Sequence, residues 1–177
     1  MSTVALRVGG HRPPLPIIRD AVEADLPAII AIYNRAVATR VSTAQLDPVT
    51  VESRKRWLTE HTPDRHPFWV LEENGTVAGW LTLKTFQPRA AYDGTAEVSV
   101  YVAEKFRRRG VARRLLEEAI ARAPRLGLHT FVGLIFAHNE ASLKLFEQLG
   151  FERWGLLPRV ARLDAVERDL TIVGRPV

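Results

Sequence analysis

The spacing of apolar residues predicts a strand followed by two helices in the first third of the chain. Ile17–Val22 ("IIRDAV") is a short apolar run typical of a strand. Glu23–Arg40 then carries its large apolar residues at helical spacing, with Asp25 placed where a helix begins. A second helix is expected from Pro48 to about His61. The segment before these elements is rich in glycine and proline and has no hydrophobic period. We therefore expect residues 1–16 to form a flexible tail and residues 17–177 to form one domain.

After the second predicted helix, the spacing of apolar residues changes from a helical period to the alternation typical of strands. Two apolar runs, Phe68–Glu72 and Thr76–Phe86, flank Asn74-Gly75, the dipeptide that most strongly indicates a tight hairpin. The pattern continues with a strand over Thr95–Val102, a helix over Gly110–Ala123, a strand over His129–Phe136, a helix over Glu140–Gly150 and strands over Glu152–Leu157 and Ala165–Val173. This order of elements predicts a single mixed α/β domain.

Composition supports one domain and narrows the chemistry. The chain has 177 residues, of which 46% are hydrophobic, enough for one sizeable core. It has no cysteine, which excludes disulfides, thiol nucleophiles and thiolate metal sites. No apolar run approaches the roughly 18 residues that a membrane span needs, and the first residues lack a secretory pattern. We expect a cytoplasmic protein that does not enter a membrane.

A net charge of +5, with 25 lysines and arginines, favours an anionic partner without identifying it. One candidate contact point is the turn before the predicted helix at Gly110. Arg107, Arg108 and Arg109 precede this glycine, and the small Ala112 follows it. A helix N-terminus has free N–H groups and a positive dipole, and glycine lets a phosphate approach the backbone closely. The stretch therefore predicts an anion-binding turn, although a solvated basic helix start is the alternative.

Further polar residues lie on the predicted strand before this turn and on the predicted helix over Glu140–Gly150. In "EVSVYV", Glu97, Ser99 and Tyr101 share one face of the strand, while valines occupy the other face. Together with "NEASLKLFEQLGF", this arrangement resembles the GNAT superfamily of N-acetyltransferases. The family's [QR]xxGx[GA] pattern matches Arg107, Gly110 and Ala112, and the residues of its next helix match Asn139, Ser142, Gly150 and Phe151.

The resemblance implies a fold, a co-substrate and a binding site. The implied fold is α/β with a single mixed, mostly antiparallel central sheet flanked by helices. The implied co-substrate is acetyl-CoA, whose pyrophosphate would be held by Arg107, Arg108, Arg109, Gly110, Val111 and Ala112. Asn139 and Ser142 would contact the pantetheine. A backbone N–H in the stretch Val100, Tyr101 and Val102 would stabilise the oxyanion, at a place where the family's strand separates from its neighbour.

A narrower resemblance lies in "RAAYDGTAEVSVYV", which is similar to the RxAYDxTAExxVYV stretch of phosphinothricin acetyltransferases and related small amino-acid N-acyltransferases. It implies that Glu97 is the general base. An amine with a pKa of about 10 is almost fully protonated at neutral pH, so a carboxylate that removes its proton, directly or through water, serves the reaction. The alternative for Glu97 is a solvated position on a strand. Arg89, Tyr92 and Arg40 are candidates for binding an acceptor carboxylate, although Arg40 also suits an exposed helix end.

The chain departs from this family at two places. Phe146 stands where relatives carry a tyrosine or histidine, and phenylalanine cannot protonate the departing CoA thiolate. Either another group serves, such as Tyr101 or a water molecule, or the thiolate leaves unassisted. The carboxyl-terminal stretch "LPRVARLDAVERDLTIVG" also lacks the family's aromatic residues, which puts a herbicide-like acceptor in question. His61, Asp64 and His66 fall in a proline-flanked loop, so we expect no metal site.

We therefore predict direct transfer of an acetyl group from acetyl-CoA to the primary amine of a small amino acid or analogue. Acetylation of a protein N-terminus, a lysine or a polyamine is the same-class alternative. The different-class alternative is a domain that binds CoA without catalysis, or a basic nucleic-acid-binding module. We expect no nucleic-acid partner, and a homodimer formed through apolar strands near the carboxyl end is a further possibility.

Overall fold

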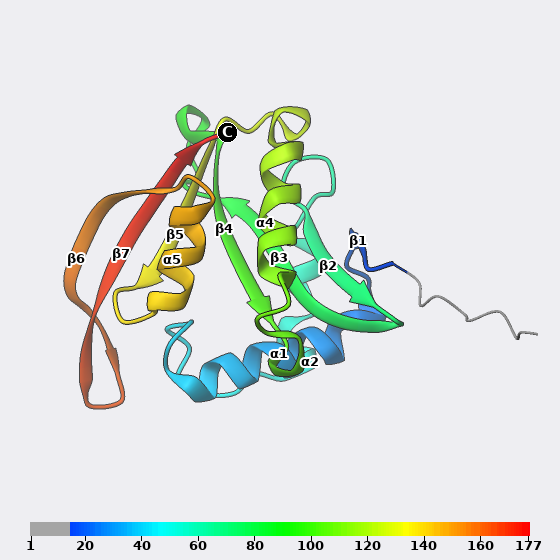
Figure 1. The fold of residues 1–177 in the computed structure, drawn as a ribbon, viewed down its shortest axis with the longest axis horizontal. Helices are drawn as coiled ribbons and strands as arrows, with labels where there is room; N and C mark the ends of the chain where they lie inside the picture. The colour runs from blue at the N-terminus through cyan, green and yellow to red at the C-terminus, as the bar shows by residue number, and fades with distance from the viewer. Residues whose placement is uncertain (1–14) are drawn as a thin grey trace, which may run out of the picture.

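The computed structural model describes residues 15–177, which form one seven-stranded sheet with helices on both faces (Figure 1). The strands are β1 (Ile17–Asp20), β2 (Phe68–Glu73), β3 (Thr76–Thr85), β4 (Thr95–Val102), β5 (Thr130–Phe136), β6 (Glu152–Leu163) and β7 (Val166–Pro176). The α-helices are α1 (Leu26–Thr39), α2 (Val51–Arg54), α3 (Arg56–Thr59), α4 (Val111–Arg122) and α5 (Glu140–Gln148). Most of the predicted tail, residues 1–14, lies outside the described residues, so the predicted division at residue 17 stays a prediction.

The strands lie in the order β1-β2-β3-β4-β5-β7-β6. Every neighbouring pair is antiparallel except β4 and β5, which are parallel. The predicted fold class, a single mixed and mostly antiparallel sheet flanked by helices, is confirmed. None of the helices in residues 15–177 is long and apolar enough to cross a membrane.

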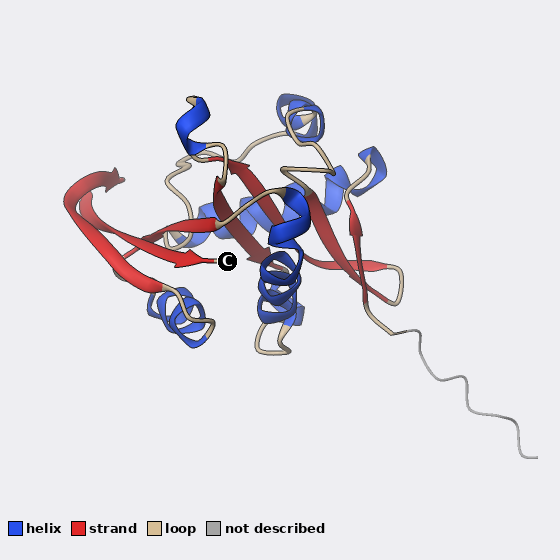
Figure 2. Cartoon of the chain, turned by 90° about the horizontal axis from the view of Figure 1, so that it is seen from above, coloured by secondary structure: helices blue, strands red, loops and turns tan. Residues whose placement is uncertain are grey.

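Helices lie on both faces of the sheet (Figure 2), and the two faces have different cores. Helices α4 and α5 cover one face, where Leu83 and Val98 of the sheet pack with Leu115 of α4. Helix α1 covers the other face, where Tyr33 packs against a largely aromatic surface that includes Trp80. Alternate residues of β3 and β4 contribute to the two cores, as the period of two predicts. The strand face with Glu97, Ser99 and Tyr101 is therefore the face that α1 covers.

The hairpin predicted at Asn74-Gly75 is present between β2 and β3. Both residues have positive φ, 51° and 72°, as a two-residue turn of this sequence requires. The register across the turn pairs Glu73 with Thr76. Local turn chemistry alone was enough to place this pair of strands.

Two predicted elements differ from the structure. The helix expected from Pro48 to about His61 is two single turns, α2 and α3, interrupted at Lys55. Leu58 N–H donates to Lys55 C=O, three residues back, at the start of α3, so the backbone tightens at the interruption. The interruption leaves Trp57 edge-on to Tyr33, with ring centroids 5.1 Å apart, a contact across the fold that local spacing did not indicate.

The last two strands are longer than predicted. The sequence predicted an end at Leu157, but β6 continues through Pro158 to Leu163. The ladder with β7 shifts register between Leu157 and Ala161, and Arg159 there has a φ of 51°. Because β6 is an edge strand, a bulge accommodates the proline without a lost ladder bond in the sheet interior.

Candidate active site

Strands β4 and β5 separate after a short stretch of parallel pairing. The paired register runs from Thr95 to Glu97, which lies opposite Val132. Beyond that point β4 continues to Val102 and β5 to Phe136 without pairing to each other. The separation, which the resemblance implied but the sequence could not show, opens the middle of the sheet between α4 and α5 (Figure 1).

Two backbone N–H groups of β4 point toward this opening. The N–H of Ala103 donates to Ala78 C=O on the β3 side at 2.9 Å. Because alternate residues of a strand direct their backbone groups to the same neighbour, Val100 and Val102 direct theirs to the opposite side. On that side no pairing to β5 exists past Glu97. These N–H groups are donors without a strand partner, and they lie in the stretch predicted to hold an oxyanion.

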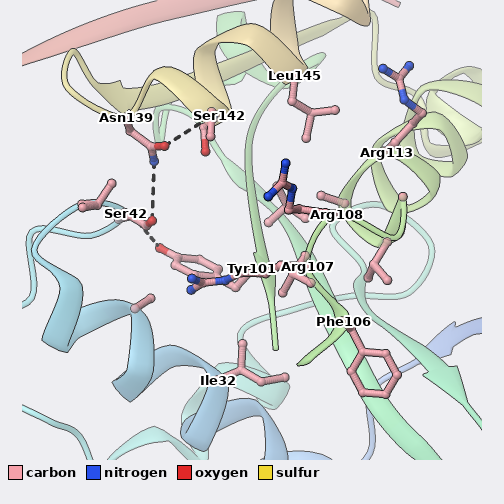
Figure 3. Close-up of a pocket in the computed structure, with 18 of the residues that line it drawn as sticks. Ile32, Ser42, Tyr101, Phe106, Arg107, Arg108, Arg113, Asn139, Ser142 and Leu145 are labelled. Carbon is pink, nitrogen blue, oxygen red and sulfur yellow. Dashed lines mark hydrogen bonds between the residues drawn. The ribbon is translucent and has the colours of Figure 1, made fainter. Parts of the chain in front are cut away.

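A cleft of about 580 Å³ occupies the opening (Figure 3). Its walls come from the end of α1 and the loop after it, the second half of β4, the start of α4 and the start of α5. They include Ile32, Val41, Ser42, Val100, Tyr101, Val102, Arg107, Arg108, Gly110, Val111, Ala112, Arg113, Asn139, Ser142, Leu145 and Gln148. Most of the residues predicted to bind the cofactor thus line one cavity, although they are spread over more than 40 positions of the sequence.

The arginine-rich turn forms the start of α4 and borders the cleft. Gly110 is the residue just before the helix and has a φ of 78°, a left-handed conformation that glycine adopts without strain. Arg108 also has a positive φ, 61°. No side chain within residues 15–177 caps the helix, so its first N–H groups remain available to a ligand. Arg109, in contrast, is turned away from the cleft and forms an ion pair with Glu73.

Asn139 organises the opposite wall of the cleft (Figure 3). Its side-chain oxygen accepts from the Ser142 N–H at 3.2 Å, which caps α5, and its amide nitrogen lies 3.5 Å from Ser42 Oγ. The Tyr101 hydroxyl donates to Ser42 C=O at 3.3 Å. Asn139 is buried. These contacts join β4, α5 and the loop after α1 at the centre of the cleft.

Burial raises the pKa of the Tyr101 phenol above its usual value, so the hydroxyl keeps its proton at neutral pH. Its ring stacks on Trp80 with centroids 4.4 Å apart. A phenol that holds its proton this tightly is a poor acid for a departing thiolate. Phe146, the other position considered for that role, is buried in the core beside Phe151 and does not line the cleft.

The charge of the cleft lining and the free space beside Gly110 suit the CoA portion of acetyl-CoA. A Cβ added at Gly110 would meet no atom within 4 Å, so the space beside this backbone is free for a phosphate. Arg107, Arg108 and Arg113 supply positive charge around it. Arg113 also donates to Gln148 across the cleft at 2.5 Å, from α4 to α5. Sequence reasoning missed Ser42 and Gln148, because no local motif marks a residue that reaches the cleft through tertiary packing.

Glu97 lies at the point where β4 and β5 separate. It is the last residue of β4 that pairs with β5, and it is opposite Lys84 of β3. Its side chain is half-buried on the face that α1 covers, and no hydrogen bond or ion pair from residues 15–177 engages it. Glu97 does not line the cleft itself. Tyr101, two positions beyond Ser99 on the same face, does.

The residues predicted to bind the acceptor carboxylate lie apart from one another. Arg89 and Tyr92 are exposed in the connection between β3 and β4, and the Tyr92 ring lies edge-on to Phe86. The guanidinium of Arg40 is bound to Asp164 in the β6–β7 hairpin at 2.9 Å and also donates to Val37 C=O. The structure thus gives the Arg40 side chain partners outside the cleft, at the end of α1.

The remaining polar candidates have local partners. His61 Nδ1 contacts Trp57 C=O, and His66 lies in a short bridge with Thr62. His138 Nε2 lies 3.0 Å from Arg40 C=O. Within residues 15–177 no group of three or more histidine, aspartate or glutamate side chains is arranged to hold a metal ion.

Comparison with known proteins identifies the family. The profile of the acetyltransferase (GNAT) family matches residues 29–151. The protein YwnH of Bacillus subtilis (strain 168), whose name assigns it provisionally to the phosphinothricin acetyltransferases, is 47% identical over 158 residues, covering 89% of this chain and 97% of that protein. An L-methionine sulfoximine/L-methionine sulfone acetyltransferase of Pseudomonas paraeruginosa is 37% identical over 157 residues, covering 88% of this chain and 91% of that one.

The fold of the chain also matches solved structures of this kind. A GNAT superfamily phosphinothricin acetyltransferase from Sinorhizobium meliloti, crystallised in complex with acetyl-CoA, superposes with a TM-score of 0.86 at 29% identity, covering 92% of this chain and 88% of that one. The resemblance to the phosphinothricin acetyltransferase branch is confirmed by these relatives. The chain therefore belongs to the GNAT family and is an N-acetyltransferase that uses acetyl-CoA.

Proposed function

We propose that the enzyme transfers the acetyl group of acetyl-CoA to the primary amine of a small amino acid or a close analogue, with Glu97 as the general base. The observation that supports this best is the position of Glu97, where β4 and β5 part beside the arginine-lined cleft. The names of the relatives support the acceptor class, because they act on phosphinothricin or on methionine sulfoximine and sulfone.

In this mechanism, acetyl-CoA supplies an activated thioester carbonyl. Arg107, Arg108 and the free N–H groups at the start of α4 hold its pyrophosphate. The Val100 or Val102 N–H donates to the carbonyl oxygen as negative charge develops on it. Asn139 and Ser142 orient the pantetheine from the opposite wall.

Glu97 serves the acceptor by taking the proton of its ammonium group, directly or through one water molecule. Only the free amine is nucleophilic, so this step precedes or accompanies attack. Phe146 is buried and has no proton to donate. The raised pKa of the Tyr101 phenol disfavours proton transfer from it to the thiolate. We therefore expect the thiolate to leave with no side-chain acid from either position.

An acetyl-CoA consumption screen tests the acceptor class. The panel contains methionine sulfoximine, methionine sulfone, phosphinothricin, polyamines and peptides with free N-termini or lysines. The proposal expects turnover with the amino-acid analogues and little with the rest. Turnover confined to peptides or polyamines would instead establish the same-class alternative. Binding of nucleic acid that needs no CoA and weakens steeply with salt would support the different-class alternative.

We further propose that the enzyme forms a homodimer through β6 and acts in the cytoplasm, where acetyl-CoA is available. Strand β6 is at the edge of the sheet. It exposes large apolar side chains, among them Trp154 (48% exposed), Leu156 (46%) and Val160 (55%). An unpaired edge with an exposed apolar surface favours pairing with a second copy.

A further inference from the structure

Lys84 and Glu97 lie directly opposite each other on the neighbouring antiparallel strands β3 and β4. Paired residues of such strands point to the same face of the sheet, so both side chains lie on the face that α1 covers. Their Cβ atoms are expected to be about 5 Å apart. The fold therefore places a positive and a negative group side by side, at the point where β4 and β5 separate.

These two charges do not neutralise each other by direct contact. No ion pair within residues 15–177 includes either side chain. The Lys84 ammonium instead lies 5.8 Å from the centroid of the Trp57 ring. Lys84 is exposed and Glu97 is half-buried. Both groups are therefore able to contact a charged ligand that comes from solvent.

The surroundings of Lys84 leave its charge without a competing anion. Lys84 lines a second, smaller cavity of about 60 Å³, whose other walls are mainly aromatic and contain no carboxylate. Burial lowers the pKa of His61 in this lining, and the Lys84 ammonium lowers it further, so the imidazole is neutral at pH 7. Among the described residues that line this cavity, Lys84 is the one cation.

The Lys84–Glu97 pair is also close to the space assigned to acetyl-CoA. Tyr101 lines both the smaller cavity and the larger cleft, so its ring borders the two spaces. An acceptor bound between Lys84 and Glu97 would thus lie beside the cleft that holds the thioester. An α-amino acid carries its ammonium and its carboxylate on one carbon atom, so its head group needs a negative and a positive partner a few ångströms apart. The cross-strand pair supplies both.

We propose that Lys84 binds the α-carboxylate of the acceptor while Glu97 receives the proton of its α-ammonium, so that this pair selects free α-amino acids over amines without that carboxylate. Lys84 then acts by binding and by placing the amine at Glu97. Arg89, the candidate that the sequence indicated for the carboxylate, is exposed in the connection beyond the end of β3, and Lys84 takes this role in its place. The inference rests on the proposed function, since it needs the amine to lie beside Glu97.

The test compares two acceptors that differ only in the α-carboxylate, methionine sulfone and its carboxamide. Lys84→Met keeps an unbranched side chain and removes the charge. It should lower kcat/KM for methionine sulfone roughly tenfold or more, mainly through a higher KM, because a charge-assisted hydrogen bond to the carboxylate is lost. The kcat/KM for the carboxamide should change little. Each variant is compared with wild type on the same acceptor, so the different amine pKa values of the two acceptors cancel.

Two further variants complete the comparison. Lys84→Arg keeps the positive charge and should retain most of the wild-type kcat/KM for methionine sulfone. Lys144→Met is the matched control, because Lys144 is exposed on α5 and lines neither cavity. It should leave both acceptors unaffected.

The outcomes separate this inference from the proposed function. If Lys84→Met lowered kcat/KM equally for both acceptors, or for neither, Lys84 would not bind the carboxylate, while amino-acid acetylation would stand. A loss confined to methionine sulfone in Arg89→Met, and absent in Lys84→Met, would return the role to Arg89 and overturn the inference. If wild-type enzyme acetylated no amino acid, the proposed function would fail and this inference with it.

Discussion

At the scale of single residues, Gly110 has the backbone conformation and the free space that the proposed phosphate-binding turn requires. Its positive φ turns the chain into α4, and the space beside it is free of protein atoms. Sequence patterns predicted that a helix starts at this glycine, because the signal is local and contiguous. They also placed Arg109 at the pyrophosphate, but its side chain pairs with Glu73 of β2 and does not line the cleft, because tertiary packing sets this contact.

Gly110→Asp should weaken acetyl-CoA binding by at least tenfold. The change places a Cβ and a negative charge where a pyrophosphate would lie, and close anionic repulsion opposes binding. Isothermal titration calorimetry on the folded variant measures the effect.

Gly127→Asp is a matched control for this experiment. Gly127 also has a positive φ, 68°, with no atom within 4 Å of an added Cβ, but it follows α4 at the far end. Both variants carry similar backbone strain, on the order of 1 kcal/mol. If both variants lost acetyl-CoA affinity equally, or if neither variant lost affinity, the Gly110 turn would not be the site that binds the phosphates.

At the scale of elements, the start of α1 is held to the sheet by one group of charges. Arg19 of β1 donates to both oxygens of Asp25, at 2.7 and 2.9 Å, and to Glu72 of β2. Asp25 is 7% exposed and also accepts from the Val22 N–H. Arg19 holds the pKa of Asp25 below its usual value, so the charged carboxylate stabilises the fold.

Asp25→Asn should therefore lower the free energy of unfolding by about 2 kcal/mol at pH 7, since it removes the charge from a buried hydrogen-bonded pair. Because the folded-state pKa is lowered, the contribution is present above the unfolded-state pKa of about 4 and is lost as pH falls below it. The difference between wild type and variant should shrink toward pH 3 in urea unfolding measurements. Asp47→Asn, at an exposed position, is the control. If the difference in unfolding free energy between wild type and Asp25→Asn stayed constant from pH 7 to pH 3, the stabilising role of the Asp25 charge would be contradicted.

How accurately each helix or strand could be predicted depends on how local its sequence signal is. The Asn74-Gly75 hairpin and the strand over Thr95–Val102 were predicted closely, because turn chemistry and alternation act over a few residues. The bulge that carries β6 past Pro158 depends on its position at the sheet edge. The separation of β4 and β5 likewise arises only when distant strands pair, so composition and spacing carry no sign of it.

At the scale of the whole molecule, the exposed edge of β6 predicts self-association. Val160→Asp should shift a dimer toward monomer, because it places a charge within an apolar contact surface. Val22→Asp, at a similarly exposed valine (52% against 55%) beside β1, should not. Light scattering at tens of micromolar, roughly where weak dimers are populated, distinguishes the two. A wild-type monomer mass that does not change with concentration would contradict the dimer.

The whole arrangement of sheet, cleft and carboxylate leads to one claim, that Glu97 deprotonates an acceptor amine beside bound acetyl-CoA. The most direct test measures N-acetylated product from methionine sulfoximine with wild-type enzyme and Glu97→Gln across pH. We expect turnover to fall about a hundredfold at neutral pH with acetyl-CoA affinity nearly intact, and the deficit to narrow as pH approaches the amine pKa of about 10, where solution supplies free amine. Glu118→Gln, on the surface of α4, should behave as wild type. Wild-type turnover by Glu97→Gln at neutral pH would remove Glu97 from the mechanism.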